Sequence, residues 1–268
     1  MKIRSLTRAN LIRQIILYSL IFLFLLIVWN FIVSVGIWDE TIVPSPIATF
    51  KALLQFHDEF LNDFIFTFGL ICEGFILTIL LALGIAVCLH FLPKLSKIIY
   101  NLSVMLQSVP LFAIAPVLFY FTGRDHIRLG QLITIILTAF FPVFVNTTEG
   151  LQRIDRDLSD VFDSMNATKC EKFVKLALPS ALHMVLAGLK ITLTMCVIGA
   201  VIAEMLVGEQ RGLGFRVKDA NAHMNMAEVF AALVLLAFTT ILLFFVLRMI
   251  AYFIQPWAAQ EDRNENQH

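Results

Sequence analysis

The sequence predicts an all-α polytopic membrane protein, and three observations support that fold class. Of its 268 residues, 59% are hydrophobic and only 15% are charged, whereas soluble proteins average about 45–50% and about 25%. The apolar residues are collected in long runs, and ~20 apolar residues are enough for a helix to cross a bilayer. Lysine plus arginine and aspartate plus glutamate each total 20. The chain therefore lacks both the basic excess of nucleic-acid-binding proteins and the high net charge of disordered ones.

Six apolar runs predict six transmembrane helices. They cover residues 15–35, 65–92, 99–121, 129–149, 182–207 and 227–254. The third run contains Pro110 and Pro116, and the fourth contains Pro142. Membrane helices tolerate such breaks only where protein or a cavity satisfies the freed backbone groups. We therefore expect the third run to be the least regular, with a helix, a bend and a second helix.

The first run resembles a signal peptide because basic residues precede it, but it is too long and lacks a small-x-small cleavage site. We interpret it as an uncleaved span that follows a cytoplasmic N-terminus, residues 1–14. With this orientation, cytoplasmic segments hold about twice as many lysines and arginines as external segments, as the positive-inside rule requires. Residues 15–255 then form the transmembrane domain. Residues 256–268 form a cytoplasmic tail, so both termini are inside.

The cysteines do not predict a metal or redox site. The four thiols are widely separated, and none has the spacing of a zinc site or a CxxC motif; they are Cys72, Cys88, Cys170 and Cys196. We expect them to be small buried hydrophobic residues. The sequence accordingly predicts no metal site, no catalytic residue and no cofactor bound by this chain.

The most informative stretch is the one long cytoplasmic loop, residues 150–181. Its apolar residues from Ile154 to Met165 recur at i, i+4, i+7, i+8 and i+11, the spacing of one helix face. Asp155 is placed to cap this helix, and Asn166 suits the left-handed position at its end.

A second short helix is predicted after a tight turn in the same loop. Thr168 and Glu171 have the spacing of a capping box, and the Leu178-Pro179 pair is expected to end the helix. The helix pair could lie on lipid headgroups or dock a cytoplasmic partner. A lipid-binding face should be basic, but the first helix carries four aspartates between Asp155 and Asp163. We therefore favour docking.

This loop resembles the EAA loop of ABC importer permeases, which reads E-A-A, three residues, G, nine residues, I-x-L-P. Asp160 takes the glutamate position, Asn166 takes the glycine position, and Leu178-Pro179 matches in place. Val161-Phe162 replaces the two alanines, and Leu176 replaces the isoleucine.

Further stretches resemble the nitrate/sulfonate/taurine branch of these permeases. In chain order they are residues 67–75, 107–116, 141–150, 187–190, 203–205, 212–215 and 256–257. An arginine is usual in the branch where this chain has Leu70, and arginine or a similar residue is common where it has Gln107. The resemblance covers roughly residues 40–258. It implies the type I ABC importer (MetI-like) permease fold, with six transmembrane helices and both termini inside.

The resemblance also implies partners. Two copies of the chain would pair around a central path in a bacterial inner membrane. An ABC ATPase dimer would sit on the cytoplasmic loops, and a periplasmic or lipid-anchored binding protein would deliver the solute. The chain has no G-x-x-x-x-G-K-[ST] phosphate loop, so the partner subunit would use the ATP.

The loop would be the element that couples ATP use to transport. The expected contact with the ATPase consists of Asp160, Asp163, Ser164, Met165, Asn166, Ala167 and Thr168. The alternative is that Val161, Phe162 and Met165 pack on the permease itself.

Polar residues within the spans are candidates for the translocation path. Those beside the proline bends, together with one near the external end of the fifth run, are Gln107, Ser108, Asn146, Thr147 and Glu204. Broken helices offer free backbone groups near mid-membrane, although these residues could equally make helix–helix hydrogen bonds. Glu204 could line the external mouth of the path, but we favour a role in which it braces the glycine-containing loop at residues 212–214.

Two further intramembrane charges are left without a single interpretation. Ionisable residues inside a span are expensive and are functional by default. Glu73 could face a cavity or a dimer interface. Lys190 could contact loop carbonyls or extend its amino group to the membrane surface.

The leading function is therefore the permease subunit of an ABC importer. The alternatives are a secondary transporter, which would need deep ion-coupling carboxylates and an internal repeat, and a non-transporting membrane scaffold, which would not need a docking loop. The branch implies a small organic anion or a pyrimidine-like heteroaromatic as the solute. The departures at Leu70 and Gln107 remove two positive charges common in the branch, which leaves room for a neutral or aromatic solute.

Overall fold

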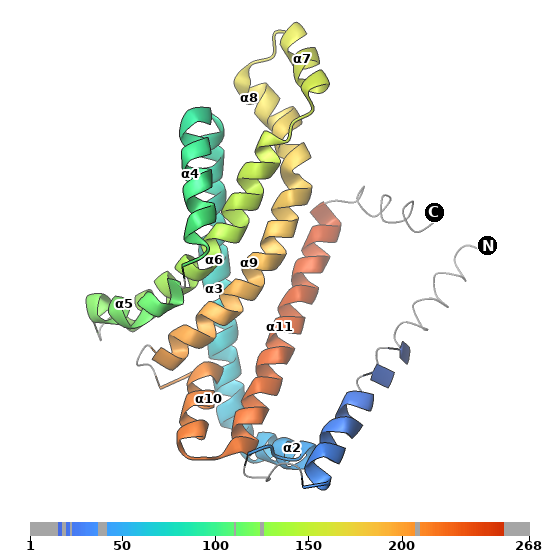
Figure 1. Ribbon diagram of the computed structural model, residues 1–268, viewed down its shortest axis with the longest axis vertical. Coiled ribbons are helices and arrows are strands. Elements are labelled where there is room, and N and C mark those ends of the chain that lie inside the picture. Colours follow the sequence, from blue (N-terminus) through green and yellow to red (C-terminus); the bar gives the residue numbers. More distant parts are fainter. Residues whose placement is uncertain are drawn as a thin grey trace, which may run out of the picture. The chain divides into compact units, whose positions relative to one another are not determined.

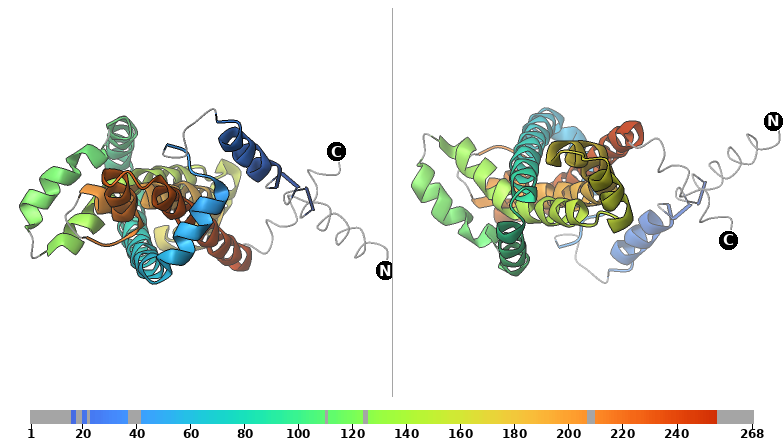
Figure 2. Two further views of the ribbon diagram at one scale, coloured as in Figure 1. Left: turned by 90° about the horizontal axis from the view of Figure 1, so that it is seen from below. Right: turned by 90° about the horizontal axis from the view of Figure 1, so that it is seen from above.

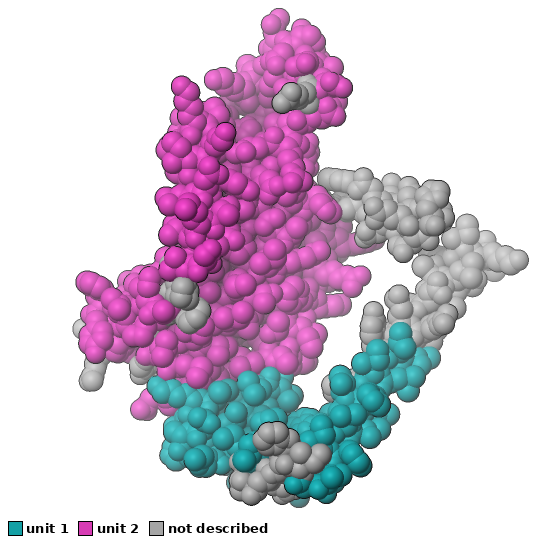
Figure 3. All heavy atoms as spheres, viewed as in Figure 1, with its two compact units in different colours: residues 1–61, 216–234 teal, residues 62–215, 235–268 magenta. Residues whose placement is uncertain are grey.

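The structure, a computed structural model, describes residues 16–17, 20–21, 23–36, 42–109, 111–123, 126–206 and 210–254. All regular structure in these residues is helical. The chain divides into two compact units, one of Met1–Leu61 with Arg216–Val234 and one of Asn62–Phe215 with Leu235–His268 (Figure 3). Each unit is considered by itself.

Helices long and apolar enough to cross a membrane occur at four places in the described residues. They are His57–His90, Ile127–Gln152, Lys169–Leu206 and Met226–Phe253. The first predicted run contributes a shorter apolar helix, Leu23–Ser34, in its described part. The all-α fold class is confirmed, whereas the count of six spans and the orientation of the termini stay predictions.

The third predicted run is broken, as its prolines indicate. Its parts are α4 (Pro93–Leu106), the 3₁₀ turn η1 (Leu111–Ile114) and α5 (Ala115–Thr122). Pro116 stands in the first turn of α5, where its missing N–H has no intrahelical partner to lose. Pro110 lies outside the described residues. In both views of Figure 2, α5 extends sideways from the other helices of the larger unit.

The larger unit is organised around the crossing of α6 (Ile127–Gln152) and α9 (Leu178–Leu206). One core cluster joins these helices to α3 (His57–His90) and to α11 (Met226–Ile254) through Leu70, Ile135, Leu193 and Leu243. Gly188 allows the close approach, because a Cβ there would lie 2.8 Å from the Asn146 Cβ. Small residues at such crossings are typical of membrane helices, which gain little from apolar burial against lipid.

The smaller unit contains α2 (Pro46–Gln55), which Ser45 caps by accepting a hydrogen bond from the backbone N–H of Ala48. Trp29 donates its indole N–H to the carbonyl of Pro44 at 3.1 Å. Arg216, on α10 (Leu213–Ala222), bridges two carboxylates, Glu59 at 2.6 Å and Glu228 at 3.0 Å. These contacts give the unit a polar interior of its own.

Candidate functional site: a helical hairpin between two spans

The candidate coupling loop begins where α6 ends, and its first element is α7 (Arg156–Ser164). Asp155 caps α7 as predicted, accepting a hydrogen bond from the Asp157 N–H at 2.9 Å. In Figure 1, α7 and α8 lie beyond the ends of α4, α6 and α9. The loop is therefore presented away from the helices that carry it.

The turn after α7 is a Schellman motif built on Asn166. Asn166 has φ 54°, the left-handed conformation that asparagine tolerates better than most residues. The Ala167 N–H donates to the Phe162 carbonyl and the Asn166 N–H donates to the Asp163 carbonyl, both at 3.0 Å. These are the two bonds that define the motif, so the backbone of the tip is fixed by its own hydrogen bonds.

The second helix, α8 (Lys169–Lys172), starts with the predicted capping box. The Thr168 N–H donates to the Glu171 carboxylate at 2.8 Å, and the Glu171 N–H donates to the Thr168 hydroxyl at 3.3 Å. Sequence analysis missed the contact that joins the two helices, in which Lys172 pairs with Asp163 at 2.6 Å. A Lys–Asp pair nine positions apart has no helical spacing, so only the hairpin geometry reveals it.

The prediction that Leu178-Pro179 ends the second helix is wrong. The chain continues from α8 through a π-helical segment, η3 (Phe173–Ala177), directly into α9. Proline removes one donor from the i→i−4 pattern, and here the Leu178 N–H reaches back to the Phe173 carbonyl. A local π-turn of this kind lets a helix pass a proline. The second half of the loop is thus a rigid extension of a long apolar helix.

The base of the loop is packed into the larger unit. Leu151, Ala177, Ala181 and Val185 form a buried cluster, against which Ile154 and Phe173 pack. Both ends of the loop therefore pack against the core, so movement of the tip would be transmitted directly to α6 and α9.

The tip itself carries exposed apolar side chains. Val161 is 52% exposed and Met165 is 72% exposed, so other parts of this single chain do not cover these two side chains. Phe162 is half-buried. Leu158 on α7 is also exposed, at 49%, and exposed apolar side chains on a largely polar hairpin form a surface suited to a partner. The contact assigned to the seven residues from Asp160 to Thr168 stays a prediction.

The candidate path residues fall into two groups. Gln107 and Ser108 are exposed at the end of α4. Asn146 and Thr147 lie on α6, where Asn146 donates to the Pro142 carbonyl at 2.8 Å. The Thr147 hydroxyl is buried without a hydrogen-bond partner among the described residues. No hydrogen bond in the described part of the chain joins the two groups, and their role in a path stays a prediction.

Glu204 lies in a buried hydrogen-bond cluster, which we call the brace: Asp63 and Thr67 on α3, Glu204 on α9 and the backbone of Gly212–Gly214. Thr67 Oγ1 and the Gly214 N–H each donate to the Glu204 carboxylate at 2.7 Å. The Leu213 N–H donates to Thr67 at 2.8 Å, and the Gly212 N–H donates to Asp63 at 2.9 Å. Glu204 is 1% exposed. Its carboxylate is therefore enclosed within the single chain, where it stabilises this turn through hydrogen bonds.

Glu73 has a partner that its position in the sequence does not suggest. Arg128, near the start of α6, donates to Glu73 at 2.7 and 3.1 Å and stacks over the Phe66 ring. The two side chains nevertheless stay 38% and 45% exposed. Lys190 is also exposed, and no ion pair to it is found in the described residues. Charges on the surface of a span face water or protein rather than lipid.

Comparison with known proteins agrees with this geometry. The family of binding-protein-dependent transport system inner membrane components matches residues 74–260. The formylaminopyrimidine transport permease protein of Halalkalibacterium halodurans is 30% identical, covering 91% of this chain and 96% of its own. The putative aliphatic sulfonates transport permease protein of Bacillus subtilis is 30% identical over 78% of this chain and 76% of its own. The nitrate import permease protein of Synechocystis is 26% identical over 82% of each chain.

Proposed function

The chain belongs to the family of binding-protein-dependent transport system inner membrane components, as a multi-pass ABC importer permease of the sulfonate and nitrate branch in a bacterial plasma membrane. From this premise we propose that two copies pair around a path for a small solute. Six spans per copy and both termini inside belong to this proposal. A permease of an ABC import system implies an ATPase and a binding protein as partners, and the chain itself is a transport subunit.

The tip of the hairpin is proposed as the surface that the ATPase dimer engages. The observation that carries this proposal is its construction: Val161 and Met165 are exposed, while the backbone beneath them is fixed by the Asn166 turn and the Lys172–Asp163 pair. A push on a rigid hairpin is passed on, whereas a flexible loop would absorb it. Rocking of the spans by rigid-body movement would then alternate access to the path.

Lys190 and the Glu73–Arg128 pair are proposed to line the path or the contact with the second copy. These side chains are exposed on spans of the single protomer, and burial against a second copy or a water-filled path would satisfy them. Gln107, Ser108, Asn146 and Thr147 are proposed as further lining residues.

Among the substrate classes of the branch, we favour a heteroaromatic solute of the pyrimidine type over a small inorganic or organic anion. Leu70 replaces a common arginine and is fully buried, so this position offers no charge to an anion. Arg128 is neutralised by Glu73. The relative covered over 96% of its length is a formylaminopyrimidine permease. Uptake of labelled aminopyrimidine and of labelled sulfonate by cells that express the complete system would separate the two classes.

The docking proposal is tested by co-purification. Val161→Asp and Met165→Asp should abolish capture of the ATPase by the tagged permease, because each places a charge in an apolar contact. Val174→Asp is the matched control, since Val174 is 58% exposed and lies outside the tip. Equal capture by all three variants would exclude the tip as the docking surface. A permease that drives uptake with no ATPase bound would favour a secondary transporter.

A further inference from the structure

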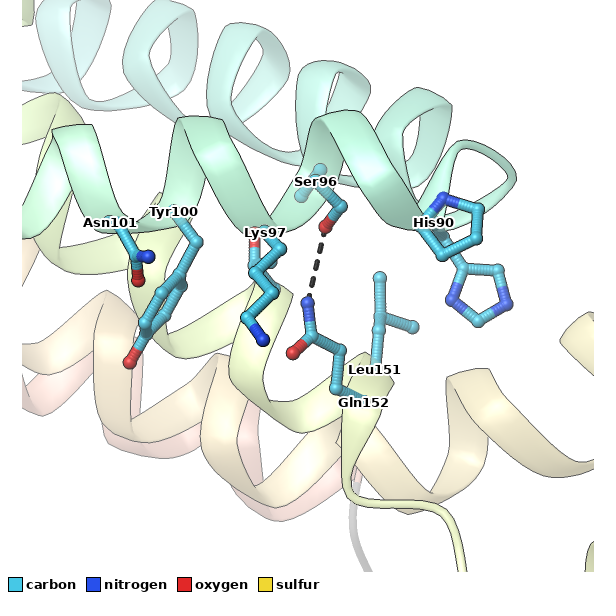
Figure 4. Close-up of a pocket in the computed structure, with 10 residues that line it drawn as sticks. His90, Ser96, Lys97, Tyr100, Asn101, Leu151 and Gln152 are labelled. Atoms are coloured by element: carbon cyan, nitrogen blue, oxygen red, sulfur yellow. Dashed lines mark hydrogen bonds between the residues drawn. The ribbon is translucent and has the colours of Figure 1, made fainter.

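A polar pocket of about 420 Å³ opens at the end of the larger unit that carries the coupling loop. It lies between the end of α3, the first half of α4 and the end of α6 (Figure 4). Its polar lining consists of His90, Ser96, Lys97, Tyr100, Asn101, Thr148 and Gln152. The volume falls within the ~300–1,000 Å³ of small-molecule sites, and none of the residues described above as path or tip contributes to it.

The lining favours an anion. It holds a lysine and several neutral hydrogen-bond donors, and none of its residues is Asp or Glu. In Figure 4, the Lys97 and Gln152 side chains extend toward each other in the space between α4 and α6. Gln152 donates one N–H to the Ser96 hydroxyl at 3.2 Å, which leaves its second amide hydrogen available.

Thr148 supplies an independent observation. It is 2% exposed, and its hydroxyl makes no hydrogen bond to any described residue. Thr134 and Thr138 on the same helix instead donate to the carbonyl four residues back. Buried hydroxyls are nearly always satisfied, so the unpaired Thr148 hydroxyl has a donor to offer to a ligand in the pocket that Thr148 lines.

We propose that this pocket binds a phosphate group, carried by an anionic phospholipid headgroup or by free phosphate. Lys97 would supply the charge, and Tyr100, Thr148 and Gln152 would supply hydrogen bonds to the phosphate oxygens. Lysine is a common partner of phosphate. The pocket lies where α3 ends at His90 and α4 begins at Pro93. In the proposed orientation this is the cytoplasmic side, where basic pockets between transmembrane helices bind lipid headgroups.

A ligand in this pocket would contact the root of the coupling loop. Gln152 is the last residue of α6, directly before the chain enters the loop. The His90 ring packs 5.2 Å from the ring of Phe173 in η3, at the other end of the loop. Occupancy would therefore hold both ends of the hairpin together. Binding itself does not depend on the proposed transport function.

Two probes distinguish the sources of phosphate. Native mass spectrometry of the full chain, taken from nanodiscs of phosphatidylcholine with and without phosphatidylglycerol, counts retained phosphatidylglycerol. Calorimetric titration in a neutral detergent measures binding of inorganic phosphate. Lys97→Gln should lower the affinity for the probe that binds by about tenfold or more, which corresponds to one charge-assisted hydrogen bond. Lys97→Arg should keep most of this affinity. Lys94→Gln is the matched control, because Lys94 lies three residues earlier on α4 and outside the pocket lining.

Retention of phosphatidylglycerol that depends on Lys97 would identify a lipid site, and binding of inorganic phosphate alone would identify a soluble ligand. Thr148→Val should cause a smaller loss of affinity for the probe. It replaces Lys97→Gln as the test variant if the lysine variant does not fold. With the ligand bound, amide hydrogen exchange across residues 153–177 should slow. The proposal is overturned if neither probe binds, or if Lys94→Gln weakens binding as much as Lys97→Gln.

Discussion

The brace around Glu204 makes a sharp prediction about Gly212. This glycine has φ +100° and its N–H donates to Asp63 at 2.9 Å. A Cβ added at Gly212 would overlap the Glu204 carboxyl carbon and would lie 2.5 and 2.7 Å from its two oxygens. Gly212→Ala must therefore strain the backbone, displace the carboxylate, or both.

The expected loss has two parts. A left-handed conformation costs a non-glycine residue ~1–2 kcal/mol. The Glu204 carboxyl group accepts hydrogen bonds from Thr67 and Gly214, and leaving one of these buried donors unsatisfied costs ~1–3 kcal/mol. The free energy of unfolding should therefore fall by about 2–5 kcal/mol, which corresponds to a melting temperature lower by roughly 10 °C for a chain of this size.

A thiol-reactive fluorescent dye can follow this unfolding in detergent, because Cys196 is fully buried. Cys88 and Cys170 are exposed and Cys72 is partly exposed, so all three are replaced by serine in the reference protein. Gly69→Ala is the control, since a Cβ there meets no atom within 4 Å. In a Glu204→Ala background only the conformational part should remain, about 1–2 kcal/mol. Equal melting temperatures for Gly212→Ala and Gly69→Ala would refute the reasoning.

Three further predictions follow from the other contacts. Lys172→Met breaks the 2.6 Å ion pair with Asp163. Because this pair is partly exposed, its loss should lower the free energy of unfolding by at most about 1 kcal/mol, so the melting temperature should hardly change while solute uptake per ATP falls. Unchanged uptake per ATP would argue against a rigid hairpin. Glu73→Gln leaves Arg128 without its carboxylate, so the double variant Glu73→Gln/Arg128→Gln should have a higher melting temperature than Glu73→Gln alone. The interaction free energy from the double-mutant cycle should be about 1 kcal/mol. Asn166→Gly should be neutral, whereas Asn166→Val should cost ~1–2 kcal/mol and weaken ATPase capture; equal capture by both would rule out the left-handed turn as a requirement.

Local patterns predicted the architecture of the loop well. The i, i+4 spacing located α7, and residue chemistry alone identified the Asp155 cap, the Asn166 turn and the Thr168–Glu171 capping box. Each of these features depends on residues within a few positions of one another. The broken third run was predictable for the same reason, since proline acts on its own helix.

Contacts between distant segments were not predictable in this way. Sequence analysis left Glu73 open, and the structure pairs it with Arg128. It predicted that Glu204 braces the turn at Gly212–Gly214, which is confirmed, but it did not predict the hydrogen bond from Thr67 on α3. The continuation of the loop past Pro179 was mispredicted, because the π-turn that accommodates the proline depends on a bond that sequence spacing does not reveal.

By itself, the sequence determined that this chain is a helical membrane protein with a helical hairpin of EAA-loop spacing. Composition, helical periodicity and capping depend on residues that are close together in the sequence, so they can be predicted from it directly. Only the tertiary structure decided which intramembrane charges are paired, that the hairpin is continuous with α9, and that Lys97, Thr148 and Gln152 meet around one pocket. These outcomes depend on how α3, α4, α6 and α9 pack, and that packing brings together residues far apart in the chain.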